Sequence, residues 1–168
     1  MVDSREIDRR TEEITEEVIA IRRAIHENPE LGFEEHETAS WVAELLTGRN
    51  IPIKTGIGGT GVVGLIEGAT PGPTIALRGD MDALPMDEES GVPFASKTPG
   101  KMHACGHDAH TAILLGAAFV LNDLRDQLKG RIKLIFQPAE ELLTGAEAMI
   151  GDGVLEDPEI DFAIGYHN

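Results

Sequence analysis

Four residues of this 168-residue chain form a candidate set of ligands for divalent metal ions, and they comprise a thiol, a carboxylate and two imidazoles: Cys105, Glu141, His107 and His167. Such a set suits Zn²⁺, and also Mn²⁺, Co²⁺ or Ni²⁺ with different preference. Cys105 and His107 are two residues apart, and in extended backbone that step points both side chains the same way. The spacing therefore indicates that these two side chains approach one ion together.

The adjacent acids Glu140 and Glu141 indicate a division of tasks. Neighbouring side chains on a strand point to opposite sides, so one acid can bind a metal while the other faces a substrate as a general base. A metal ion with an open coordination position lowers the pKa of its bound water to about 7, and a nearby carboxylate can then take the proton. Asp80 and Asp82 are candidates for orienting a ligating histidine.

Other interpretations of the same residues stay open. A single cysteine is commonly a small core residue, or Cys105 is a nucleophile that acts with His107 or His110 in a thiol hydrolase. His103, His107 and His110 would share one helix face and form a rival metal site. That rival requires the helix to begin before Gly106, which the glycine disfavours.

Apolar periodicity predicts the elements that must position these residues, namely helices over residues 7–25, 34–46, 110–124 and 145–150 and strands over 61–66, 74–77, 132–136 and 162–164. Strands that alternate with helices indicate an α/β sandwich. Three of the strands are followed directly by acids or an imidazole: Asp80 and Asp82, Glu140 and Glu141, and His167. Because ligands of open α/β sheets lie outside the carboxyl ends of the strands, we expect these residues to meet there.

The chain is strongly acidic, with 30 Asp and Glu against 14 Lys and Arg and a formal net charge of −16. Nucleic acid and anionic membrane surfaces are therefore not expected as partners, since phosphate binding needs clustered cations. We expect the acidic runs at residues 34–35 and 87–89, which include Glu35 and Glu88, to be solvated surface.

Composition also predicts the compartment. No apolar run approaches the roughly 18 residues that a transmembrane helix needs. The N-terminal segment is too acidic, and lacks the apolar stretch, for a secretory signal. The single cysteine excludes an internal disulfide, which together with the missing signal favours a reducing cytoplasm.

Four stretches of the sequence resemble, in order and in spacing, a family of metal-dependent amidohydrolases of the aminoacylase and carboxypeptidase kind. The stretches are RAIHENPEL at 23–31, LRGDMDALP at 77–85, MHACGHDAH at 102–110 and QPAEE at 137–141, and the closing GYHN at 165–168 is similar to a fifth. Hippurate hydrolase, indoleacetyl-amino acid hydrolases and N-acetyldiaminopimelate deacetylase are members of this kind. The resemblance covers nearly the whole chain.

The resemblance implies a role for each matching residue. Cys105, His107, Glu141 and His167 would bind one or two divalent ions, most readily Mn²⁺ or Zn²⁺ and alternatively Co²⁺ or Ni²⁺. The catalytic residues would be Glu140, as the general base, and Asp82, which supports the site from behind. The implied reaction is hydrolysis of the amide bond that joins an acyl or aroyl group to an amino acid, or of a small peptide.

The resemblance implies a zinc-peptidase-like three-layer α/β sandwich with a mixed, mostly parallel sheet. Members of the family are longer and carry an inserted lid and dimerisation domain, further strands and one more histidine ligand. We therefore expect residues 1–168 to be the N-terminal part of the catalytic domain, with an incomplete sheet and no lid. A complementary C-terminal half or a second copy is an expected partner. The alternative is a catalytically inactive remnant or subunit that binds metal weakly or not at all.

Overall fold

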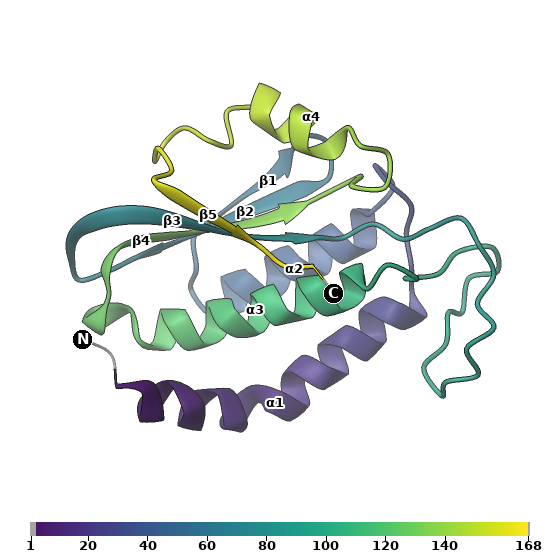
Figure 1. Cartoon of the computed structure of the whole chain (residues 1–168), viewed down its shortest axis with the longest axis horizontal. Helices are drawn as coiled ribbons and strands as arrows, with labels where there is room; N and C mark the ends of the chain where they lie inside the picture. The colour runs from purple at the N-terminus through teal and green to yellow at the C-terminus, as the bar shows by residue number, and fades with distance from the viewer. Residues whose placement is uncertain (1–2, 168) are drawn as a thin grey trace.

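In the computed structural model, which describes residues 3–167, one five-stranded sheet carries helices on both faces (Figure 1). The helices are α1 (Ser4–Glu27), α2 (His36–Gly48), α3 (His107–Asp123) and α4 (Gly145–Gly151), with a short 3₁₀ turn, η1 (Arg125–Gln127). The strands are β1 (Ile53–Ile57), β2 (Gly61–Glu67), β3 (Thr70–Asp80), β4 (Lys129–Gln137) and β5 (Phe162–Gly165).

Each helix and strand expected from apolar periodicity is present, with shifted bounds. Helices α1 and α3 each begin three residues before the expected start, α1 at Ser4 and α3 at His107. Strand β1 was not predicted. Its sequence, IKTGI, is mostly exposed and has a lysine, a threonine and a glycine at its centre, so it lacks the apolar pattern that identified the other strands.

The strands lie in the order β1-β2-β4-β3-β5. β3 pairs in parallel with β4 and with β5, whereas β2 pairs antiparallel with β1 and with β4. Among the described strands the sheet is therefore evenly mixed, and the expectation of a mostly parallel sheet is wrong in that respect. One antiparallel pair is the hairpin of β1 and β2, which turns through Gly58 and Gly59 at φ values of 66° and 101°, and the other is β2 with β4.

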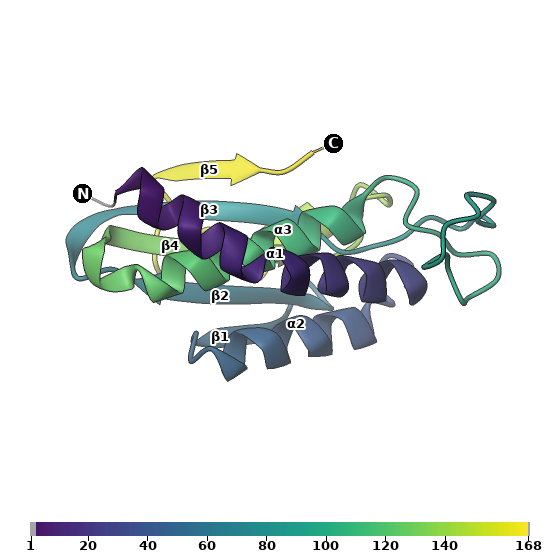
Figure 2. The same cartoon turned by 90° about the horizontal axis from the view of Figure 1, so that it is seen from below.

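The two faces of the sheet bury different helices. Helices α2 and α3 pack on one face, with α1 on α3 (Figure 2), and α4 covers the other face (Figure 1). Alternation along β2 sends Val62 to the larger core and Val63 to the smaller core under α4. These layers confirm the predicted three-layer α/β sandwich. No helix in the described range is long and apolar enough to cross a membrane.

Parallel pairing places the carboxyl ends of β3 and β4 side by side. Asp80 lies opposite Gln137, and the Met81 N–H donates to the Gln137 carbonyl over 3.0 Å. Helix α3 is docked at the same end, because Thr111 Oγ1 donates to the Asp80 carbonyl over 2.7 Å. The segments that follow both strands, with Asp82 and Glu140, therefore leave the sheet next to the first turn of α3.

Candidate metal centre

The backbone between Cys105 and His107 is not extended, which corrects the expectation from their spacing. Gly106 has a φ of 79° and is the N-cap of α3, so that His107 is the first helical residue. The left-handed turn at Gly106 nevertheless brings both side chains to one place. The Cys105 thiol, a His107 ring nitrogen and a Glu141 carboxylate oxygen all lie within 4.8 Å of one another.

Asp82 holds both His107 and Glu141. Its Oδ1 lies 3.1 Å from His107 Nδ1, and its Oδ2 accepts the Glu141 N–H over 2.9 Å. Burial raises the pKa of Asp82, but the hydrogen bonds from His107 and from the backbone N–H groups of Glu141 and Glu140 outweigh burial and leave that pKa lowered. Asp82 is thus an ionised acceptor, which makes His107 Nδ1 the donor and leaves Nε2 as the ring atom that can bind a metal.

His107 is 1% exposed, and acidic groups surround its Nε2 atom. The distances from Nε2 are 3.6 Å to Asp80 Oδ2, 3.7 Å to Glu140 Oε2 and 3.8 Å to Glu141 Oε1. Burial lowers the pKa of His107, yet the hydrogen bond to Asp82 and the charges of Asp80, Asp82 and Glu141 raise it overall. The surroundings of this nitrogen therefore favour a positive charge, whether a proton or a cation.

Glu140 and Glu141 lie in the turn after β4 and not on a strand, so strand alternation does not separate them. Both carboxylates approach His107 Nε2 within 4 Å. They differ in burial, since the Glu140 side chain is 36% exposed and the Glu141 side chain 23%. Glu141 Oε1 is itself buried and has no hydrogen-bond partner among the described residues.

These three residues fit a divalent cation. Around a tetrahedral zinc ion, with ligand bonds of about 2.0–2.3 Å, the ligand atoms stand about 3–4 Å apart. The thiol, imidazole and carboxylate atoms of the Cys105 group all lie within 4.8 Å of one another, so small side-chain shifts would bring them to that separation. A buried carboxylate oxygen without a hydrogen bond is costly unless an ion or a donor reaches it. The unpartnered Glu141 Oε1 is therefore the observation that argues most directly for a cation here.

The electrostatics of Cys105 disfavour the thiol-hydrolase alternative. Burial and the negative charges of Glu141, Glu140 and Asp80 all raise the pKa of the Cys105 thiol. A nucleophilic cysteine needs the opposite, a lowered pKa. A cation bound beside the sulfur would displace the thiol proton and reverse this balance, as metal–thiolate sites require.

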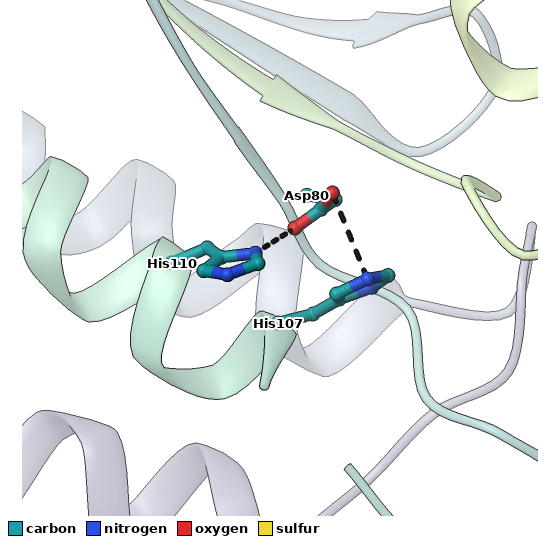
Figure 3. A group of neighbouring side chains, drawn as sticks. All are labelled: Asp80, His107 and His110. Carbon is teal, nitrogen blue, oxygen red and sulfur yellow. Dashed lines mark hydrogen bonds and ion pairs between the residues drawn. The ribbon is translucent and has the colours of Figure 1, made fainter. Parts of the chain in front are cut away.

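A second buried group, Asp80, His107 and His110, shares His107 with the first (Figure 3). Asp80 accepts a hydrogen bond from His110 Nδ1 over 2.6 Å and pairs with Arg78 Nη1 over 2.6 Å. Both carboxylate oxygens of Asp80 are thus engaged within the protein, so this group is better suited to positioning than to holding an ion. The role of His110 was not predicted from the sequence, although its three-residue spacing from His107 on a helix could have indicated it.

The rival trio of histidines does not form, because His103 precedes α3 and lies apart from its first turn. His103 is 4% exposed, and neither of its ring nitrogens has a hydrogen-bond partner among the described residues. Burial lowers the pKa of His103 to about 4. Its surroundings therefore favour a neutral imidazole.

His167 lies beside the site and not within it. It follows β5 and is exposed, and the groups of possible ligands found among residues 3–167 do not include it. Its ring centroid is 6.1 Å from that of His110. Asn168, which completes the closing GYHN segment, is outside the described residues.

A hollow of about 520 Å³ opens between α1, the long loop of residues 81–106 and His167. Its wall combines apolar side chains with the unpartnered His103 and the candidate ligand Cys105, and it includes Val92, Phe94, Met102, His26 and Arg22. Arg22 is neutralised, because its Nε pairs with the buried Asp108 over 2.6 Å. The candidate ligands therefore border a hollow that can admit a small molecule.

Two acids expected on the solvated surface are buried instead. Glu35 is 0% exposed, and its carboxylate accepts hydrogen bonds from Thr60 Oγ1 and the Ala139 N–H. The Glu88 side chain is 3% exposed and pairs with His26. Both predictions of a solvated acid are wrong because the hydrogen-bond partners come from distant parts of the chain, which a local run of acids does not reveal. The other acids of these runs, Glu34, Asp87 and Glu89, are exposed as expected.

Comparison with known proteins supplies independent findings. Residues 76–168 match the family described as Peptidase family M20/M25/M40. The chain is 51% identical over 155 residues to N-acetyl-L-cysteine deacetylase of Bacillus subtilis, covering 92% of this chain and 37% of that protein. It is 47% identical over 168 residues to N-acyl-L-amino acid amidohydrolase of Geobacillus stearothermophilus, covering 96% of this chain and 44% of that protein.

Among solved structures, the fold matches the Bacillus subtilis YXEP protein, described as a dinuclear metal binding peptidase from the M20 family. The TM-score is 0.85 with 43% identity, and the match covers 99% of this chain and 44% of that chain. The present chain thus spans less than half the length of the relatives it matches.

Proposed function

This chain belongs to Peptidase family M20/M25/M40, and on that premise we propose that residues 1–168 are the N-terminal part of the catalytic domain of a metal-dependent amidohydrolase. The resemblance read from the sequence motifs is confirmed at the level of the family. The proposed reaction is cleavage of the amide bond in N-acyl or N-aroyl amino acids or small peptides. The names of the relatives, a deacetylase and an N-acyl amino acid amidohydrolase, support this substrate class.

One observation carries the proposal. Cys105 and His107 come from the start of α3 and Glu141 from the turn after β4, and all three converge within 4.8 Å; Glu141 contributes a buried oxygen that has no hydrogen-bond partner among the described residues. We propose these three as ligands of one or two divalent ions, with Mn²⁺ or Zn²⁺ favoured over Co²⁺ or Ni²⁺. His167, which lies beside the group, is proposed as a further ligand.

The residues around the ligands have separate proposed tasks. When bound, divalent cations would polarise the scissile carbonyl and lower the pKa of a water molecule. Glu140, the more exposed acid of its pair, would take a proton from the attacking water and deliver it to the leaving amine. Asp82 would keep His107 in the tautomer whose Nε2 binds the metal, and would hold the Glu141 backbone at the same time.

The hollow beside Cys105 and His167 is the proposed place for the substrate. Its apolar wall suits an acyl or aroyl group, and the pairing of Arg22 with Asp108 removes free positive charge from that side. We propose a complementary C-terminal segment or a second copy of the chain as the partner that completes recognition. Nucleic acid and membrane remain outside the proposed partners.

The test is metal binding followed by hydrolysis. The purified chain is equilibrated with Zn²⁺ or Mn²⁺, dialysed, and measured for metal content, with His107→Ala as the test variant and His36→Ala, an exposed histidine on α2, as its control. We expect one or two ions per chain, retained in His36→Ala and lost in His107→Ala. Hydrolysis of N-acetyl and N-benzoyl amino acids is then assayed with the loaded chain.

The exposed position of His167 favours one alternative, an inactive remnant or subunit that binds metal weakly or not at all. Weak or no metal retention without hydrolysis would support that alternative, and a chain that retains no ion would contradict the proposed site. Activity that survives a chelator but is lost on alkylation of Cys105 would favour the thiol hydrolase instead.

A further inference from the structure

The turn that carries Glu140 and Glu141 begins with a backbone conformation that is uncommon for a residue with a side chain. Ala139 has a φ of 49°, in the left-handed region, and is 0% exposed. This conformation redirects the chain after β4 and aims the two acids at His107. Such a backbone persists only where surrounding contacts fix it.

Glu35 supplies one of those contacts from a distant part of the chain. Its Oε1 accepts the Ala139 N–H over 2.8 Å, although the two residues are 104 positions apart. Its Oε2 accepts the Thr60 hydroxyl over 2.5 Å, which fixes the orientation of the carboxylate. On the other side of the same residue, the Gly145 N–H donates to the Ala139 carbonyl over 3.2 Å. Both backbone polar groups of Ala139 are therefore held.

A second carboxylate holds the other end of the same turn. Asp82 Oδ2 accepts the Glu141 N–H over 2.9 Å. Glu140 thus lies between two residues whose N–H groups donate to buried carboxylates, Ala139 to Glu35 and Glu141 to Asp82. Packing leaves this turn little freedom, since a Cβ at Gly32 would stand 3.1 Å from the Ala139 Cα and a Cβ at Gly145 would stand 1.7 Å from the Pro138 carbonyl oxygen.

Glu35 does not serve the helix that it precedes. It occupies the N-cap position of α2, yet its side chain makes no capping hydrogen bond. Glu30 performs that task, because its carboxylate accepts the N–H groups of Glu37 and Thr38 over 3.0 and 2.8 Å. Burying a carboxylate that has no cationic partner is costly, and the pKa of Glu35 is raised by that burial. The hydrogen bonds that offset this cost come from the Thr60 hydroxyl and the Ala139 N–H.

We propose that Glu35 is a positioning residue of the hydrolytic site, which fixes the Ala139 peptide and through it the direction of Glu140 and Glu141. The inference rests on the proposed function, because it assigns these acids to metal binding and proton transfer. What Glu35 contributes is the hydrogen bond to Ala139 and not its negative charge. A glutamine, whose amide oxygen accepts from Ala139 while its NH₂ group donates to Thr60, would therefore replace it.

The experiment compares three variants of the full 168-residue chain: Glu35→Leu, Glu35→Gln and, as a matched control, Glu30→Leu. Two quantities are measured, the Zn²⁺ dissociation constant by chelator competition and the hydrogen-exchange rate of the Ala139 amide in the metal-free chain by NMR. We expect Glu35→Leu to weaken Zn²⁺ binding by about 10–100-fold, the range typical of residues that hold ligands in place. Its Ala139 amide should exchange at least about tenfold faster, because the buried acceptor is lost.

Glu35→Gln should stay within about threefold of the unsubstituted chain in both measurements, since it preserves the hydrogen bond. Glu30→Leu should lose thermal stability through the lost cap, with its Zn²⁺ affinity and Ala139 exchange unchanged. Equal Zn²⁺ affinities for Glu35→Leu and Glu30→Leu would overturn the proposal. A Glu35→Gln variant as impaired as Glu35→Leu would overturn it too, because charge would then be the cause.

Two further results, a Glu35→Leu variant that does not fold and a chain that binds no Zn²⁺, still allow the proposal to be tested. Should Glu35→Leu fail to fold, Glu35→Asp takes its place, since the shorter side chain keeps the charge but does not reach Ala139 and Thr60 together. An Ala139 exchange rate and a Zn²⁺ affinity unchanged in Glu35→Asp would contradict the proposal. Should the unsubstituted chain bind no Zn²⁺, the proposed function fails, whereas the order of Ala139 exchange rates still decides whether Glu35 holds the turn.

Discussion

Two buried histidines four positions apart have opposite surroundings. His107 is 1% exposed and has carboxylate oxygens of four acids within 4 Å of its ring nitrogens: Asp80, Asp82, Glu140 and Glu141. His103 is 4% exposed, and neither of its ring nitrogens has a hydrogen-bond partner among the described residues. The pKa of His107 is raised by acidic neighbours that outweigh its burial, whereas burial lowers the pKa of His103 to about 4.

The difference shows that burial alone does not make a histidine a ligand. The His107 region receives acids from the ends of β3 and β4, because parallel pairing brings those ends together. His103 lines the hollow, and its ring centroid lies 6.3 Å from that of His26. Negative charge that would attract a cation is therefore concentrated at His107, whereas at His103 burial outweighs the charges of Asp108 and Asp82.

The largest expected effect comes from exchanging each histidine for leucine. His107→Leu should weaken Zn²⁺ binding by more than about 100-fold, since it removes a ligand at the centre of the acids. His103→Leu should leave the affinity within about threefold. Chelator competition measures both, with circular dichroism to establish that each variant is folded. Similar losses in the two variants would mean that His103 belongs to the metal site after all.

Asp82→Asn tests how the acids support His107. Asp82 accepts from His107 Nδ1 and from the Glu141 N–H, and an amide has only one oxygen, so its NH₂ group must face one of these donors. We expect Zn²⁺ affinity to fall by about 10–100-fold. Asp87→Asn, an exposed aspartate in the loop of residues 81–106, is the control. An unchanged affinity would show that His107 keeps its tautomer without Asp82.

Glu88, which lines the same hollow as His103, predicts a pH dependence of stability. Burial raises the pKa of Glu88, but hydrogen bonds from Ser90, the Ser96 N–H and His26 outweigh it and lower the pKa to about 2. Between pH 4.5 and about 2 the unfolded chain therefore binds the proton first, and the stability that Glu88 contributes is lost as the pH falls. Above pH 4.5 that contribution is fully present.

Urea unfolding between pH 6 and 3 measures this dependence in the unsubstituted chain and in Glu88→Gln. The difference in unfolding free energy should be largest near pH 6, at roughly 1–3 kcal/mol, and should shrink on acidification. Glu89→Gln, an exposed neighbour, controls for the loss of one negative charge. A difference that is constant across this range would show that folding does not lower the pKa of Glu88.

The sequence predicted the candidate ligands better than the path of the backbone between them. Strand-end placement identified Asp82, Glu140 and Glu141, because residue order along a parallel sheet determines what meets at its edge. The geometry within the site depends on left-handed turns at Gly106 and Ala139, and apolar periodicity carries no signal for either. The burial of Glu35 was missed for a related reason, since its donors are tertiary and lie 25 and 104 positions away.

The smallest expected effect concerns the stability of the metal-free chain. His103→Leu replaces a buried ring with two unpartnered nitrogens by an apolar side chain of similar size, so the unfolding free energy should rise by about 1 kcal/mol. The comparison is His26→Leu, which breaks hydrogen bonds to Asp108 and Glu88 at 2.7 and 3.1 Å and should instead lower the unfolding free energy by about 1–3 kcal/mol. Urea titration at pH 7 measures both variants. A His103→Leu variant destabilised as much as His26→Leu would mean that the His103 ring has a stabilising partner, such as an ordered water molecule in the hollow. His103 and His107 would then both have hydrogen-bond partners and would differ only in what those partners are.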